Sequence, residues 1–459
     1  MPGSVRGDLL VMAAQGQRKK ALMLAYVFPP FFSVGGSIRA VKFAKYLPEF
    51  GWDPMILTID DSREYESQRR EGSESLLKEL PESVRIFRTT AGEAPVEVLE
   101  RGRAARQRSR LLGPVISGLG RLRGWAQANL LLPDEHITWL PFAVRAGRRI
   151  VREHRPDVIF ATCPPHSVVL AGALLSRQTG LPLVLDYRDD WIDTPRYRAK
   201  PAPARWLERR LEAWAVRTAQ RVILVTEASR QAFLARYPHQ DPSKFPLIPN
   251  GVDLEQFRAA WDIERTADGA GPFRILHAGL LSVSDDWHRS PEALFRALSN
   301  IREARPEVGE RLEVTFTGRL PEPYREMAQA MGLEGTVREA GYLPQPEYLR
   351  SLRQADLLLA VNYDGFDTLV PGKIYEYWAV GGPPILLLSC PGAAENQLGL
   401  AVSTHDPSAI EGAILEAYQR RESGRPLEVR LDGIERFDRR RLAERLAGEL
   451  AAVSGGERS

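Results

Sequence analysis

The chain is poor in cysteine: its 459 residues include only two, Cys163 and Cys390. They lie far apart in the sequence, and neither belongs to a CxxC motif or to a cluster of cysteine and histidine. A disulfide framework and a structural zinc site are therefore unexpected. The rest of the composition is typical of a globular protein, and we expect a reducing compartment and a cytoplasmic location.

Long apolar runs are absent as well. No segment reaches the roughly 18 unbroken apolar residues that a membrane-spanning helix needs. A short apolar run, Leu9–Ala14, comes before a cluster of basic residues, whereas a secretory signal carries its positive charge first. We expect residues 1–19 to be a flexible leader.

The net charge is only +3, but arginine is concentrated between residues 96 and 130. Apolar side chains alternate with these arginines at helical spacing. Two interpretations are open: a solvated helix that packs on the domain, or a basic amphipathic surface on anionic lipid at the inner face of the membrane. Nucleic acid is not an expected partner, because aromatic side chains do not alternate with the arginines as stacking platforms would.

Short apolar segments alternate with helical patterns along the whole chain, which predicts an α/β fold with parallel sheets covered on both faces. In the first half the predicted strands are Ala21–Val27, Pro54–Thr58, Val84–Arg88, Asp157–Ala161, Leu183–Asp186 and Arg221–Val225. In the second half they are Phe273–Ala278, Leu312–Thr317, Asp356–Val361, Pro384–Leu388 and Leu400–Ser403.

The two series of strands predict two doubly wound domains, because the chain is too long for one ordinary domain. A turn-rich strip, 245–253, separates them. We assign residues 20–248 to the first domain and 249–431 to the second. An arginine-rich helical pattern over 432–459 predicts a final helix that packs back on the first domain.

Unusual residues in the first half follow predicted strands, and ligands of open α/β folds bind at the carboxyl ends of the strands. Gly35 and Gly36 allow a close approach to a diphosphate or sugar, with Arg39 one turn later; an ordinary strand-to-helix loop is the alternative. His166 follows Cys163-Pro-Pro and would face the cleft. Asp189 can bind sugar hydroxyls or pair with a neighbouring arginine. The dinucleotide fingerprint GxGxxG is absent.

The basic residues that could bind a phosphate lie in the second half of the chain. Gly279 ends a predicted strand, and Arg289 is expected at the start of the next helix, where it could bind a phosphate. Backbone groups at Tyr342 and Leu343 could contact a base.

The segment Val370–Leu388 is the most informative. Gly372 and Lys373 begin a predicted helix, whose positive end attracts a diphosphate. Glu376 lies on the same helix face and can accept both hydroxyls of a ribose.

Together these segments resemble family-four glycosyltransferases of the GT-B fold, in a subgroup with a PGK-x-x-E-Y element. The resemblance covers nearly the whole chain. The matching segments are FPPFFSVGGSIRA, CPPHS, DYRDDW, PNGVD, HAGLL, HRSPEALFRAL, GYLPQPEYLRSLRQADLLLAV and PGKIYEYWAVGGPPIL.

The resemblance implies roles for individual residues. Gly36 would lie near the donor phosphates and His166 beside the transferred sugar. Arg289 and Lys373 would bind the diphosphate, and Glu376 would hold the ribose.

Two positions depart from the family pattern. Thr368, beside Asp367, stands where the family has a first acidic residue, and Leu280 stands where it has an arginine. We therefore list Asp367 and Thr368 only as candidate sugar or acceptor contacts.

The resemblance implies a retaining transferase that needs no cofactor or metal. Its donor would be a nucleotide-diphosphate sugar, a UDP-sugar first among them, and its acceptor a saccharide or lipid-linked saccharide of the cell envelope. Two alternatives stay open: a non-hydrolysing nucleotide-sugar epimerase, and a catalytically silent protein that binds a nucleotide sugar.

Overall fold

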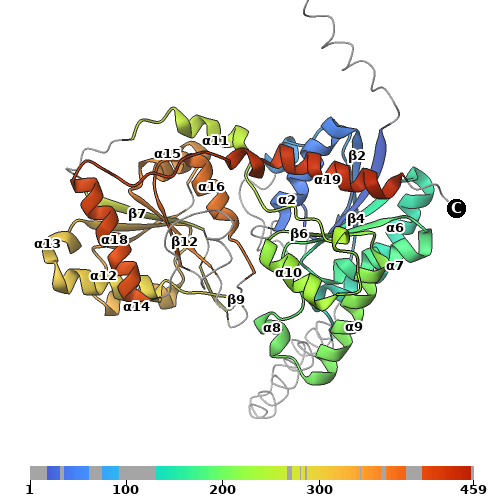
Figure 1. Cartoon of the computed structure of the whole chain (residues 1–459), viewed down its shortest axis with the longest axis horizontal. Coiled ribbons are helices and arrows are strands. Elements are labelled where there is room, and N and C mark those ends of the chain that lie inside the picture. Colours follow the sequence, from blue (N-terminus) through green and yellow to red (C-terminus); the bar gives the residue numbers. More distant parts are fainter. Residues whose placement is uncertain are drawn as a thin grey trace, which may run out of the picture.

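The computed structural model of the chain has two lobes, each built on its own parallel sheet, and a final helix that returns to the first lobe (Figure 1). The structure describes residues 18–30, 36–60, 75–91, 131–265, 271–279, 281–284, 287–341, 343–362, 368–388 and 406–455. For residues 282–284 and 287–289 it describes the backbone alone.

The first lobe contains a six-stranded parallel sheet in the order β3-β2-β1-β4-β5-β6. Both of its faces are buried: Leu22 and Leu24 of β1 enter one core, whereas Met23 and Ala25 enter the other. The strands are β1 (Lys19–Ala25), β2 (Trp52–Ile59), β3 (Arg85–Thr89), β4 (Val158–Cys163), β5 (Leu183–Tyr187) and β6 (Arg221–Leu224). The helices are α2 (Gly36–Tyr46), η1 (Leu47–Phe50), α3 (Ser75–Lys78), η3 (Glu135–Trp139), α6 (Leu140–His154), α7 (Ser167–Thr179), α8 (Pro195–Arg198), α9 (Ala202–Thr218), α10 (Glu227–Arg236) and η4 (Pro242–Lys244).

The second lobe contains a five-stranded parallel sheet in the order β11-β10-β7-β12-β13 and a short β8–β9 hairpin. The strands are β7 (Phe273–Ala278), β8 (Ser282–Ser284), β9 (Trp287–Arg289), β10 (Leu312–Thr317), β11 (Val337–Gly341), β12 (Leu357–Val361) and β13 (Ile385–Leu388). The helices are α11 (Leu254–Trp261), α12 (Glu292–Ala304), α13 (Pro306–Gly309), α14 (Glu322–Ala330), α15 (Gln345–Gln354), α16 (Gly372–Val380) and α18 (Pro407–Glu422), followed by η5 (Ile434–Phe437) and α19 (Arg439–Ser454).

The order of the strands reverses at the corresponding point in both sheets, and this confirms the predicted pair of doubly wound domains. In each lobe the first strand has the second strand on one side and the fourth on the other, so the order reverses between β1 and β4 and between β7 and β12. Ligand sites of such sheets lie at this reversal, outside the carboxyl ends of the strands. The predicted strand at Leu400–Ser403 lies outside the described residues.

A hinge of two chain segments joins the lobes. The backbone N–H of Val252 donates to Phe437 O at 3.0 Å, and that of Arg439 donates to Val252 O at 2.9 Å. A Cβ at Gly251 would lie 2.0 Å from Phe437 O, so a side chain at this position would force the two segments apart. The next residue but one, Asp253, accepts hydrogen bonds from three side chains of α2: Lys42, Lys45 and Tyr46.

Helix α19 starts at the hinge between the lobes and lies along α2 of the first lobe (Figure 1). Its buried stripe, Leu442, Ala443, Leu446 and Leu450, belongs to the same core as Met23 of β1. Polar contacts at its edges, such as Arg221 with Glu449 at 3.1 Å, add to this packing. The C-terminal helix is therefore part of the first lobe's core.

We predict that Leu446→Ala destabilises the first lobe by about 2–5 kcal/mol, because it leaves a cavity in a fully buried core. The free energy of unfolding in urea measures the change. The control is Glu444→Ala, an exposed position on the same helix, which should alter it by less than about 0.5 kcal/mol. Equal values for the two variants would contradict the packing.

Candidate functional site at the carboxyl edges of the two sheets

The loop after β4 carries His166 to the carboxyl edge of the first sheet, and two neighbours fix its shape. The carboxylate of Asp134 accepts the Ser167 N–H at 3.0 Å, at the start of α7. The Arg188 guanidinium donates to the carbonyls of Cys163 and Pro164 at 2.9 and 2.6 Å. The position of His166 is thus set by a buried acid and a buried arginine rather than by the proline pair alone.

The imidazole of His166 lies in an aromatic and largely desolvated setting. It stacks on Trp191, with ring centroids 5.6 Å apart and planes at 21°, and its Nε2 lies 3.3 Å from the carbonyl oxygen of Asp189. Burial lowers the pKa of His166 to about 4. The imidazole is therefore neutral near pH 7, and it can contact a sugar without adding positive charge.

The two lobes touch at Thr368, four residues before helix α16 of the second lobe. Its hydroxyl donates to Asp190 Oδ2 at 2.8 Å, and its carbonyl accepts the Thr226 hydroxyl at 2.7 Å. Ser229 donates to the other oxygen of Asp190. A narrow crevice of about 10 Å³ lies here, lined in part by Asp189 and Leu369. Asp190, the neighbour of the predicted Asp189, makes this contact between the lobes.

Tyr377 joins helix α16 to β7 and β12, the two strands between which the strand order of the second sheet reverses. The Tyr377 hydroxyl accepts the Ala278 N–H of β7 at 2.7 Å and donates to Leu359 O of β12 at 3.1 Å. This bond bridges the two strands between which the sheet order reverses. The first turn of α16, with Gly372 and Lys373, consequently begins at the carboxyl edge.

Lys373 and Glu376 share one face of α16 and pair with each other. Lys373 Nζ lies 2.8 Å from Glu376 Oε2, and the Tyr348 hydroxyl donates to the same oxygen at 2.8 Å. Both side chains keep solvent access, with 39% and 22% of their surface exposed. A ligand can therefore reach the cation and the carboxylate together. Tyr348, on α15, was not predicted, because nothing in the local sequence separates it from an ordinary amphipathic helix.

The structure locates the remaining predicted residues as follows. Gly36 begins α2, Gly279 directly follows β7, and Leu343 is partly buried between β11 and α15. Gly35, Tyr342 and Asp367 lie outside the described residues, as does the predicted basic segment 96–130.

Two expectations are wrong. Arg289 was expected at the start of a helix, but it belongs to strand β9, and α12 begins three residues later at Glu292. Arg39 was expected to contact a sugar, but only 1% of it is exposed. Its guanidinium donates to both oxygens of Asp186 and to the carbonyls of Ile248 and Pro249. Arg39 is a structural residue.

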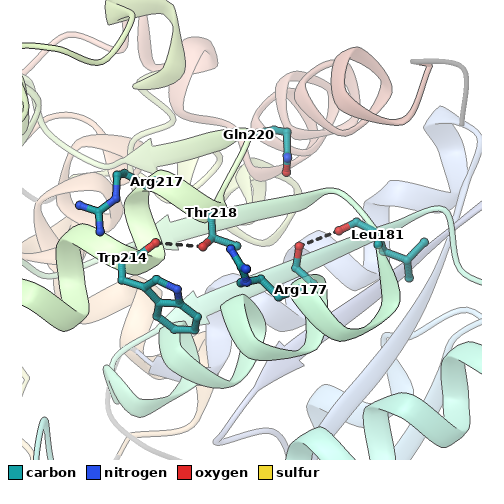
Figure 2. Close-up of a pocket in the computed structure, with 8 residues that line it drawn as sticks. Arg177, Leu181, Trp214, Arg217, Thr218 and Gln220 are labelled. Atoms are coloured by element: carbon teal, nitrogen blue, oxygen red, sulfur yellow. Dashed lines mark hydrogen bonds between the residues drawn. The ribbon is translucent and has the colours of Figure 1, made fainter. Parts of the chain in front are cut away.

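A separate hollow of about 500 Å³ lies on the first lobe, between the C-terminal ends of α7 and α9 (Figure 2). Leu181 and Gln220, which line it, lie two residues before β5 and one residue before β6. The hollow is therefore at the amino edge of the sheet, opposite the loops that carry His166 and Asp190. Its Ser176 and Thr218 hydroxyls donate to nearby carbonyls. We do not count it as part of the candidate site.

The described helices include none that is both long and apolar enough to cross a bilayer.

Comparison with known proteins agrees with this architecture. Residues 34–256 match the model of Glycosyltransferase Family 4. The D-inositol 3-phosphate glycosyltransferase of Streptomyces scabiei is 27% identical over 220 residues, which are 43% of this chain and 46% of that protein. The matched region thus spans about half the length of the curated relatives.

Solved structures show the fold. Anabaena HepE, in complex with UDP, superimposes with a TM-score of 0.59 at 16% identity, covering 94% of this chain and 100% of that one. A UDP-N-acetylglucosamine 2-epimerase gives a TM-score of 0.52 at 12% identity, covering 97% and 98%. These likenesses confirm the predicted GT-B fold.

We predict a pH dependence of stability that belongs to His166. Its pKa is about 4 in the folded protein against an ordinary value of 6.5. Between these values the unfolded chain binds more protons, so the free energy of unfolding should fall as the pH drops through this window. His166→Asn should flatten that part of the profile, measured as urea midpoints at stepped pH. His239→Asn, at an exposed position, is the control; parallel profiles for wild type and His166→Asn would contradict the prediction.

Proposed function

We propose that this chain, whose residues 34–256 match the model of Glycosyltransferase Family 4, moves a sugar from a nucleotide-diphosphate donor to an acceptor with retention of anomeric configuration. One observation carries the proposal. A helix N-terminus with a solvent-accessible Lys373–Glu376 pair lies at the carboxyl edge of one sheet, and His166 lies at the carboxyl edge of the other. Thr368 and Asp190 join these edges directly.

The donor side follows from charge and hydrogen bonding. The positive end of α16 and Lys373 suit a diphosphate, and the Glu376 carboxylate suits a ribose diol. Lys373 and Tyr348 both donate to one oxygen of Glu376, Oε2. To accept both hydroxyls of a ribose, Glu376 must release these two donors in part. We expect a UDP-sugar, and HepE, which has the same fold, was crystallised in complex with UDP.

The reaction develops negative charge on the leaving diphosphate as the bond to the sugar C1 breaks. Lys373, the start of α16 and Arg289 on the hairpin after β7 would stabilise that charge electrostatically. His166 is neutral at pH 7 and would line the pocket of the transferred sugar. The acceptor hydroxyl would attack from the leaving-group face, and its proton would pass to the diphosphate. No protein nucleophile is required.

The epimerase alternative shares the architecture, so the fold alone does not separate the two activities. The family match over the first lobe favours transfer. An epimerase would interconvert a nucleotide sugar with no acceptor present. Incubating the protein with a panel of nucleotide sugars, with and without acceptor, distinguishes the two reactions.

Lys373→Ala and Arg289→Ala should each lower kcat by a few hundred-fold, or about 3 kcal/mol of transition-state stabilisation. The measurement is turnover of the nucleotide sugar that the panel identifies. Arg296→Ala is the matched control, because Arg296 pairs with Glu292 on the exposed face of α12. Wild-type rates in both test variants would remove the phosphate role from Lys373 and Arg289.

The acceptor is proposed to be a lipid-linked or envelope saccharide, because helix α9 has the character of a membrane-facing surface. Its acids, Glu208 and Glu212, are fully buried, whereas its exposed charges are all arginines. Trp206 is 60% exposed and Leu207 41%, the most exposed large apolar side chains among the described residues. The Arg210 guanidinium lies 5.0 Å from the Trp206 ring. Such a mixture of arginine and aromatic side chains suits an anionic bilayer.

We predict that vesicles with anionic lipid sediment the wild-type protein in a salt-sensitive way. Arg209→Glu/Arg210→Glu should weaken this binding by about 10-fold or more, since each basic residue near such a surface contributes about 1 kcal/mol. The matched control is Arg420→Glu/Arg425→Glu, two exposed arginines of the second lobe. Equal sedimentation with neutral vesicles, or equal loss in both variants, would contradict the surface.

A further inference from the structure

Arg439, the first residue of α19, lies at the point where the two lobes meet. Its backbone N–H donates to Val252 of the hinge. Two residues earlier, Phe437 packs on Tyr375 of α16, with ring centroids 5.0 Å apart. One turn later, Leu442 enters the core shared with α2. The Arg439 side chain consequently lies between α16 of the second lobe and α2 of the first.

The charge of Arg439 is buried and uncompensated. Only 6% of the residue is exposed, and its Nε and Nη1 have no hydrogen-bond partner. In the part of the chain that the structure describes, no carboxylate forms an ion pair with it. Burying an unpaired charge costs free energy, so an arginine in this state indicates that an anion binds it.

The acids close enough to influence Arg439 are already engaged. Asp186 accepts Arg39 and Thr162, and Glu376 accepts Lys373 and Tyr348. The guanidinium of Arg39 also lies nearby and adds repulsion. In the described structure neither carboxylate is hydrogen-bonded to the Nε or Nη1 of Arg439.

A second unpartnered donor lies beside Arg439. The hydroxyl of Tyr375 is buried and has no hydrogen-bond partner. Tyr375 directly precedes Glu376 on α16 and belongs to the same inter-lobe region as Arg439. The two guanidinium nitrogens can only donate, and the phenol hydroxyl can donate as well, a set that suits a phosphate oxygen.

We propose that Arg439 is a phosphate ligand, which binds the anionic group of the nucleoside diphosphate from the hinge side of the cleft. The inference rests on the proposed function and adds to it a cation that comes from the C-terminal helix rather than from the loops of the donor lobe. We assign the anion to the nucleotide because Tyr375 belongs to α16, the helix that carries Lys373 and Glu376, and Phe437, two residues before Arg439, packs on it.

The test compares binding of UDP and of uridine, which lacks the phosphates, by isothermal titration. Arg439→Met should weaken UDP binding by about 10- to 100-fold, the loss of hydrogen bonds to a charged group, and leave uridine binding unchanged. The same variant should raise the melting temperature of the ligand-free protein, because an apolar chain of similar length replaces a buried unpaired charge. Arg440→Met is the control: Arg440 is 58% exposed and pairs with Glu49, so neither quantity should change.

Each other outcome has a distinct meaning. Wild-type affinity for UDP in Arg439→Met overturns the inference and leaves the proposed function intact. If Arg439→Met loses affinity for UDP and uridine equally and melts at a lower temperature, Arg439 is a structural residue and the inference is overturned as well. Wild-type protein that binds neither UDP nor another nucleoside diphosphate overturns the proposed function itself. If Arg439→Met does not fold, Arg439→Lys serves instead. Lysine keeps the positive charge but lacks the paired N–H donors of the guanidinium. Undiminished UDP affinity in this variant would again overturn the inference.

Discussion

The buried ion pair between Arg39 and Asp186 is the constraint on which the geometry of the cleft depends. Arg39 belongs to α2 and Asp186 to β5, and the same guanidinium also binds the carbonyls of Ile248 and Pro249 at the hinge. A buried pair repays its desolvation only when its remaining donors and acceptors are satisfied. Here four hydrogen bonds meet that condition, so one side chain fixes the first lobe, the hinge and the start of the second lobe together.

From this fixed hinge the two edges approach each other with different electrostatic characters. The first lobe offers a neutral His166 beside aromatic rings, whereas α16 offers Lys373 and a positive helix end. A sugar has hydroxyls and no charge, and a diphosphate is strongly anionic. The separation of charge across the cleft therefore matches the two halves of an activated sugar.

Much of the fold could be predicted because several strands are buried on both faces and appear as short apolar runs, as β4 and β12 do. Strand β11 was missed because it is an edge strand whose middle residues are exposed, and its sequence VREAG contains no apolar run. The hairpin before α12 was missed for a related reason: three-residue strands carry too little pattern to be distinguished from a helix start.

The site was less predictable than the fold. Spacing along one helix is local information, so the proximity of Lys373 and Glu376 could be predicted. Partners from distant segments could not: Asp134 and Arg188 shape the His166 loop across 33 and 24 residues, and Thr368 reaches Asp190 across 178. Arg39 was misassigned because its sequence position beside the glycines indicated a ligand, while its partner, Asp186, lies 147 residues away.

The return of α19 to the first lobe has a consequence for how the molecule is made. The face of the first sheet that contains Met23 is covered in part by α2 and in part by Leu442–Leu450, which are synthesised after the second lobe. The N-terminal lobe therefore completes this core only after the second lobe has been synthesised, although it emerges first. A cut in the hinge would separate part of that core from the rest of it.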